Sequence, residues 1–230
     1  MSGQQNPIKD IAEVLQTKSA IKQQSYRNLC ANFKQLEKES RKIIRLIKAN
    51  IANKDEDITL KVTKINHQEF HVHIAGELLV FLMHTNTNII VLDDAHAYAQ
   101  SEYVKEDRNR RYLGQINIYN FMADSFKYNR LNDPGYLIAR LFINADNQFL
   151  VEGERQLNFM FEKVSVKPIT NTDLNIISLL VISQSLDNDL VTSPFPSIRV
   201  ISVHQKNEKS QDLGGGHKIG FQMSYQSEIK

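Results

Sequence analysis

The chain has little of three things that would narrow its function: cysteine, net charge and long apolar runs. Cys30 is the single cysteine among 230 residues, so no internal disulfide can form. The 28 basic and 26 acidic residues give no general reason to expect a polyanionic partner. The longest apolar runs, 78–83 and 176–182, are far shorter than the ~20 residues that a membrane-spanning helix needs.

Motifs for targeting and catalysis are also missing. The N-terminus lacks the basic start and apolar segment of a secretory signal. No nucleophile elbow is present, and Gly214-Gly215-Gly216 is not followed by the Lys-Ser/Thr of a phosphate loop. Hydrophobic residues make up 41% of the chain, which is ordinary for a globular protein. These features predict a cytoplasmic protein without a membrane span, and they favour a role other than catalysis.

The most regular feature of the sequence is an apolar stripe near the N-terminus. Its members follow one another at alternating steps of three and four residues, the spacing of a coiled-coil helix. They are Tyr26, Leu29, Phe33, Leu36, Ser40, Ile43 and Ile47. We expect the apolar members, Tyr26, Leu29, Phe33, Leu36, Ile43 and Ile47, to form an interface with a second copy or with a protein partner.

A shorter apolar face precedes this stripe. Asn6-Pro7 is a favourable helix start, because Asn caps a helix and Pro suits its first position. Ile8, Ile11, Val14 and Leu15 then lie at helical spacing. Between Gln16 and Ser25 the apolar pattern fades, so residues 7–53 could form one long helix or two.

Basic side chains fall on the face of this helix opposite the apolar stripe. They are Lys34, Lys38, Arg41, Arg45 and Lys48. Such a face could bind nucleic acid through its phosphates. The alternative is an ordinary solvated face, which the interspersed Glu37 and Glu39 favour.

From residue 55 onward the apolar period changes from helical to alternating. Short polar turns separate the predicted strands, which is typical of an antiparallel sheet. The pattern changes between Asp93 and Leu113, where the charge-dense stretch from Glu102 to Arg111 could form a short helix or a mobile loop. Its mixed signs favour a solvated excursion from the sheet. The predicted strands are 58–62, 70–74, 78–83, 89–92, 116–119, 137–143, 149–151, 157–161, 198–202 and 219–223.

The sequence therefore predicts an α+β fold in two parts. Residues 1–54 form a long helix or a helical hairpin, which packs on the sheet or projects from it and could serve as an oligomerisation element. Residues 55–230 form an α+β domain with a mostly antiparallel sheet. One further buried helix is expected near 172–187, because its sequence is apolar on most sides; the alternative is a core strand at 176–182.

A metal site is the main catalytic alternative. His71 and His73 alternate along a predicted strand, so both imidazoles lie on one face and could share a divalent metal. Together with Glu77 they resemble the first cupin motif, His-x-His followed by Glu, although the flanking glycines and a second motif are missing. Further ligands could come from His84, Asp93, Asp94 and His96. The alternative is an ordinary polar strand face.

The sequence is compatible with three functions. The first is a non-enzymatic protein that self-associates or binds a protein partner through its N-terminal helices. The second is a metal-dependent enzyme built on His71 and His73. The third is nucleic-acid binding through the basic helix face. The first is favoured because it requires the fewest additional assumptions about the sequence.

Overall fold

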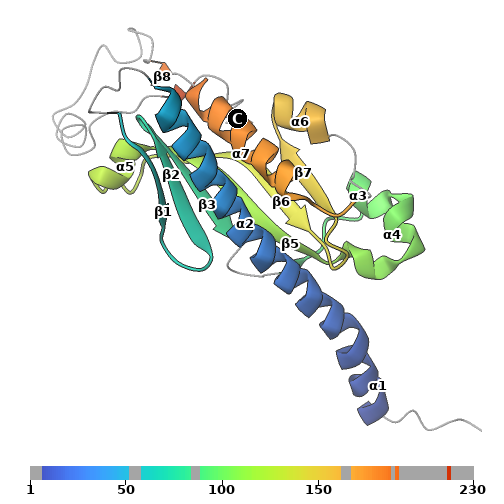
Figure 1. Cartoon of the computed structure of the whole chain (residues 1–230). Helices are drawn as coiled ribbons and strands as arrows, with labels where there is room; N and C mark the ends of the chain where they lie inside the picture. Colours follow the sequence, from blue (N-terminus) through green and yellow to red (C-terminus); the bar gives the residue numbers. More distant parts are fainter. Residues whose placement is uncertain are drawn as a thin grey trace, which may run out of the picture.

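The computed structural model describes residues 7–51, 58–83, 89–161 and 167–187, together with the backbone of 190–191 and 217–218. Within these residues the predicted α+β class is confirmed: a long N-terminal helix and further helices pack with a seven-stranded antiparallel sheet (Figure 1). The predicted strands at 198–202 and 219–223 lie outside the described residues, as does the boundary expected at residue 54.

The sheet is an antiparallel meander with the strand order β1-β2-β3-β5-β6-β7, and a short strand, β4, also pairs with β5. Neighbouring strands in space are mostly neighbours in sequence, because tight turns join them. The strands are β1 (Leu60–Lys64), β2 (Glu69–Ile74), β3 (Glu77–Met83), β4 (Ile89–Ile90), β5 (Leu113–Met122), β6 (Tyr136–Ile143) and β7 (Phe149–Gly153). A separate pair consists of β8 (Leu190–Val191) and β9 (His217–Lys218).

Two helices cover one face of the sheet (Figure 1). One is α2 (Ala20–Asn50), and the other is α7 (Asn171–Leu186), the predicted second buried helix. Thr170 begins α7 with a capping box in which its side chain and that of Asp173 each accept a backbone N–H of the other residue. Apolar side chains of both helices and of the covered sheet face form the main core.

Short helices lie on the opposite face of the sheet. The segment between β4 and β5, predicted as a solvated excursion, contains α3 (Ala97–Gln100), α4 (Glu102–Glu106) and the 3₁₀ helix η2 (Arg108–Arg111). It buries Tyr98 and Val104 against Leu113, Phe142 and Leu150 in a second, smaller core. The same face carries α5 (Ala123–Lys127) beyond the end of β5.

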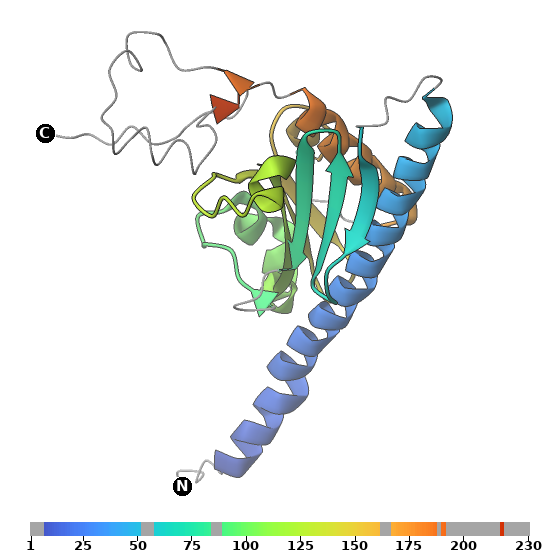
Figure 2. The ribbon, with the colours of Figure 1, turned by 90° about the vertical axis from the view of Figure 1, so that its left-hand side faces the viewer.

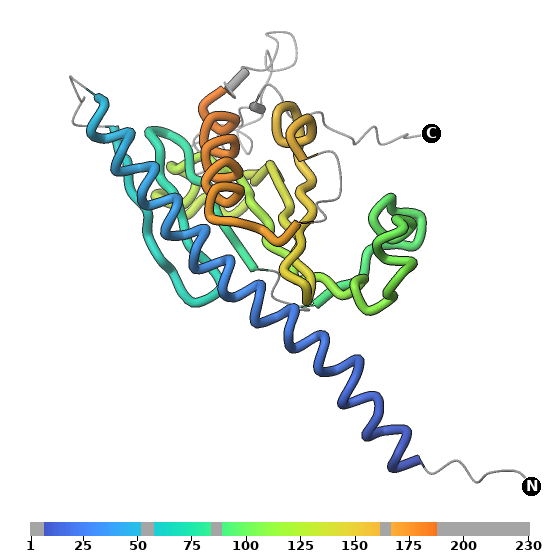
Figure 3. The backbone as a smooth tube through the Cα atoms, turned by 45° about the vertical axis from the view of Figure 1, so that its right-hand side comes forward, coloured from blue at the N-terminus to red at the C-terminus, as the bar shows by residue number. Residues whose placement is uncertain are grey.

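The N-terminal helix is continuous from Pro7 to Asn50. It consists of α1 (Pro7–Val14), a π-helical segment η1 (Leu15–Ser19) and α2. Figures 2 and 3 show its N-terminal part extending away from the sheet, whereas the remainder crosses the sheet face. The question of one helix or two is therefore settled in favour of one.

One predicted strand is wrong. Residues 157–161 form part of the helix α6 (Gln156–Phe161) instead of a strand. The alternating apolar residues of this segment also contain an i, i+4 pair, Leu157 and Phe161, which lies on one face of a helix and packs against the main core. Phe159, the middle member of the alternation, is 84% exposed.

Helix α2 lies directly against the sheet at Gly114. A Cβ atom added there would lie 2.8 Å from both Cβ and Cδ2 of Leu29, a fully buried residue of α2. We expect Gly114→Ala to lower the free energy of unfolding by about 1–3 kcal/mol, because helix and sheet must move apart. Urea denaturation measures the change. Gly76→Ala is the matched control, since nothing lies within 4 Å of its added Cβ; equal losses in both variants would contradict this account of the packing.

Candidate functional site

The predicted interface residues lie in the core of their own chain. Leu29, Phe33, Leu36 and Ile43 are buried, and Tyr26 and Ile47 pack against the same cluster. The stripe has coiled-coil spacing because α2 contacts a sheet and a second helix along its length. The premise that these side chains lie exposed is therefore corrected: strands of the same chain and α7 cover them.

The exposed apolar surface of the helix lies further toward its N-terminus. Every residue from 7 to 18 is exposed. The large aliphatic side chains of this segment are Ile8 (76% exposed), Ile11 (60%), Val14 (51%) and Leu15 (60%). This segment, residues 7–18, is called the projecting segment below.

The strand register separates the residues of the predicted metal site. Residues that face each other across two strands share a face of the sheet, and neighbours along a strand do not. His73 is opposite Leu78, whereas Ile74, on the core face, is opposite Glu77. Glu77 therefore lies on the other face from the two histidines, which corrects the expected His-x-His and Glu arrangement.

His71 already has a partner on its own strand. Its Nε2 lies 2.6 Å from Oε1 of Glu69, and its ring contacts that of Phe126 edge-on. Within the described residues, no three His, Cys, Asp or Glu side chains come together in a way that could hold a metal ion. His84, a further proposed ligand, lies outside the described residues.

The further ligands proposed after β4, Asp93, Asp94 and His96, lie far from His71 and His73 on β2. His96 Nε2 lies 2.8 Å from Glu152 on β7, and four strand spacings, roughly 19 Å, separate β7 from β2. His96 Nδ1 accepts the N–H of Tyr98 at the start of α3, so both ring nitrogens are occupied by structural contacts. Asp93 accepts the N–H of Ala95 within a turn.

The basic helix face is exposed as predicted, with one exception. Lys34, Lys38, Arg45 and Lys48 are exposed, and they lie on the side of α2 that faces away from the sheet. Arg41 instead joins α2 to β1: its guanidinium donates to the carbonyl oxygen of Val62 (2.8 Å) and pairs with Glu37 (2.7 Å).

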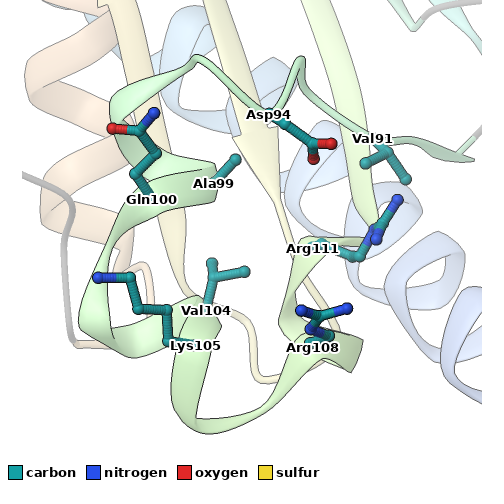
Figure 4. Close-up of a pocket in the computed structure, with 8 residues that line it drawn as sticks. All are labelled: Val91, Asp94, Ala99, Gln100, Val104, Lys105, Arg108 and Arg111. Carbon is teal, nitrogen blue, oxygen red and sulfur yellow. The ribbon is translucent and has the colours of Figure 1, made fainter.

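A surface depression of about 310 Å³ lies within the segment between β4 and β5. Figure 4 shows Ala99 and Val104 near its middle, with arginines along one side. Its lining residues are Val91, Asp94, Ala99, Gln100, Val104, Lys105, Arg108 and Arg111. Three of these are basic and one is acidic, so we call it the cationic depression.

Hydrogen bonds of Tyr98, Tyr103 and Asn144 behind the depression hold its wall in place. Tyr98 Oη donates to the carbonyl oxygen of Arg110 (2.8 Å), and Tyr103 Oη donates to Asp146 (3.0 Å). Asn144 Nδ2 donates to both hydroxyl oxygens. Burial raises the pKa of Tyr98 to about 12 and raises that of Tyr103 as well, so both hydroxyls keep the protons that they donate.

Sequence reasoning missed the cationic depression. The sequence indicated only a charge-dense stretch of mixed sign, from Glu102 to Arg111. The available indication was the arginine spacing in Arg-Asn-Arg-Arg, because residues three apart share a face in a 3₁₀ helix. The arginine that forms an ion pair is selected by Asp146, which is distant in sequence.

Comparison of the chain with protein-family models, with curated proteins and with solved structures gave no match. No helix in the part of the chain that the structure describes combines the length and apolarity needed to cross a bilayer. Two exposed surfaces, the projecting segment and the cationic depression, are the candidate functional sites of this protein.

The environment of His73 predicts a pH-dependent stability. Burial lowers the pKa of His73 below its ordinary value, and the nearby charges of His71 and Lys61 act in the same direction. The unfolded chain therefore takes up a proton near pH 6.5 that the folded chain resists, so stability falls as the pH drops from 7.5 through 6.5.

We expect His73→Gln to weaken this decline in urea denaturation series at several pH values. His67→Gln, in an exposed turn, is the matched control and keeps the wild-type slope. If the stability of His73→Gln depends on pH as steeply as that of the wild-type chain, His73 does not couple folding to pH.

Proposed function

We propose that this protein self-associates through the projecting segment, as a non-enzymatic protein whose N-terminal helix binds a second copy of the chain. The observation that supports this proposal is the exposure of four large aliphatic side chains on a helix that leaves the body of the protein (Figure 2). Clustered exposed apolar residues on one element are typical of interaction sites.

The projecting segment is well formed for a physical reason. A helix of its length is marginal alone in water, because nucleation is unfavourable. Here it extends α2, whose packing against the sheet supplies the nucleus, so each added residue needs only propagation. The helix therefore presents its apolar residues in a fixed arrangement before any partner binds, which lowers the entropic cost of association.

A second copy in antiparallel orientation fits the spacing of this surface. Ile8, Ile11 and Leu15 follow steps of three and four. Ala12 and Val14, which flank this face of the helix, carry no charge. With Ile11 near a twofold axis, Ile8 of one chain lies opposite Leu15 of the other, so one patch binds itself. Because every residue from 7 to 18 is exposed, two projecting segments can pair along this length. The sheets of the two copies, with their packed helices, then lie at opposite ends of the helix pair.

The expected dimer is of moderate strength. Full burial of one large aliphatic side chain contributes about 1.5–3 kcal/mol. Because the four such side chains of the projecting segment are already partly covered in the monomer, burying only their exposed fractions in both copies contributes roughly 7–15 kcal/mol. Association costs about 4–15 kcal/mol in lost freedom of movement. A dissociation constant in the micromolar range, about −8 kcal/mol, is consistent with these magnitudes.

Light scattering on fractions from size-exclusion chromatography tests the proposal. The wild-type chain is expected to change from monomer to dimer as its concentration rises to ~100 µM. The double variant Ile11→Asp, Leu15→Asp is expected to raise the dissociation constant at least about tenfold, because it places charges in the apolar contact. Both positions are exposed in the monomer, so its fold should be unaffected.

The same helix offers a matched control. Leu46 is 55% exposed but lies on α2, away from the projecting segment. Leu46→Asp is expected to leave the dissociation constant unchanged. A wild-type chain that stays monomeric throughout this range, or equal weakening by the control variant, would overturn the proposal.

A further inference from the structure

The strongest unassigned feature is the pair of arginines that faces the cationic depression. Arg108 and Arg111 are three residues apart in η2, and a 3₁₀ helix has three residues per turn, so their side chains lie on the same face. Figure 4 places both on one side of the depression, with Asp94 further along that side. Two neighbouring guanidinium groups repel each other unless an anion lies between them.

Neither arginine is neutralised by an acidic side chain in the described part of the chain. The ion pairs of the described segment between β4 and β5 involve other basic residues: Arg110 pairs with Glu106 (3.0 Å) and Asp146 (3.3 Å), Lys105 pairs with Glu102 (2.6 Å), and His96 contacts Glu152 (2.8 Å). The Nε atom of Arg111 is buried and has no hydrogen-bond partner among the described residues. An unpaired buried donor of this kind is unfavourable unless a ligand accepts from it.

The backbone that carries the two arginines is held from behind. Between them in the sequence, Arg110 turns the other way, and its Nη1 donates to the carbonyl oxygen of Tyr103 (2.8 Å). Its guanidinium carbon lies 4.2 Å from the centre of the Tyr103 ring, and its own carbonyl oxygen accepts from Tyr98. The backbone that carries Arg108 and Arg111 is therefore held in place before a ligand arrives, so that binding has to order only their side chains.

We propose that the cationic depression binds a small phosphomonoester, with the phosphate group between Arg108 and Arg111. Two planar guanidinium groups present several donors to the three terminal oxygens of a phosphate, and its charge of nearly −2 balances both. Val91, which is 39% exposed, and the half-buried Ala99 offer an apolar surface to the organic part of the ligand. The volume of about 310 Å³ lies at the lower end of small-molecule sites, which favours a small ligand.

Asp94 adds a specific expectation about the ligand. A carboxylate at the same depression repels a free phosphate but accepts a hydrogen bond from a hydroxyl or amine. Removing its charge by Asp94→Asn is therefore expected to tighten the binding of inorganic phosphate by about 2–5-fold. Asp94 is exposed, so this substitution leaves the fold in place.

Isothermal titration calorimetry of the full chain with phenyl phosphate and with inorganic phosphate tests the proposal. Phenyl phosphate is expected to bind with a dissociation constant of about 0.1–1 mM, more tightly than inorganic phosphate, because its ring contacts the apolar surface. The double variant Arg108→Gln, Arg111→Gln is expected to bind at least about tenfold more weakly. The single variant Arg108→Gln, at an exposed position, gives the same direction of change without disturbing the half-buried Arg111.

Lys34→Gln, Lys38→Gln is the matched control, since it removes the same charge from the exposed face of α2. The control is expected to retain wild-type affinity. Equal weakening in the control and the arginine variants would show that the anion responds only to net charge and would overturn the site. Absence of binding by both ligands at millimolar concentration, or unchanged affinity in Arg108→Gln, would overturn it as well.

Discussion

The turn between β6 and β7 holds both the projecting segment and the wall of the cationic depression in place. Its first residue, Asn144, is fully buried, and each polar group of its side chain has a partner. Its Nδ2 donates to the hydroxyl oxygens of Tyr98 and Tyr103, and its Oδ1 accepts the N–H groups of Asp146 and Gln148. A buried amide is stabilising only when it is fully paired, so this turn has one well-defined arrangement.

Helix α2 is attached to the same turn from the other side. Asn28 Nδ2 donates to the carbonyl oxygens of Asn144 (3.0 Å) and Ala145 (2.8 Å), and Asn32 donates to the side chain of Asn147 (2.7 Å). These bonds lie near the point where the helix leaves the sheet. The direction of the projecting segment and the wall of the cationic depression therefore depend on one set of hydrogen bonds.

Local patterns predicted most of the elements, because each strand and helix with one buried face shows that face in its sequence. The alternation at 70–74 became β2, and the capped apolar run after Thr170 became α7. The strand predicted at 157–161 was wrong, because the spacing of Leu157, Phe159 and Phe161 fits a strand and a helix equally well. The core contacts of Leu157 and Phe161 decided between the two.

The class of fold, the helical N-terminal segment and the apolar face of that segment follow from the sequence alone, whereas the continuity of the helix does not. Periodicity shows that a side chain is covered, but it carries no information about whether the cover comes from the same chain or from another. The folded chain shows that strands and α7 enclose the stripe around Leu29 while Ile8 and Ile11 remain exposed. It likewise separated Arg110, which contacts Asp146 across the fold, from Arg108 and Arg111, because ion pairs between distant residues depend on how the chain folds.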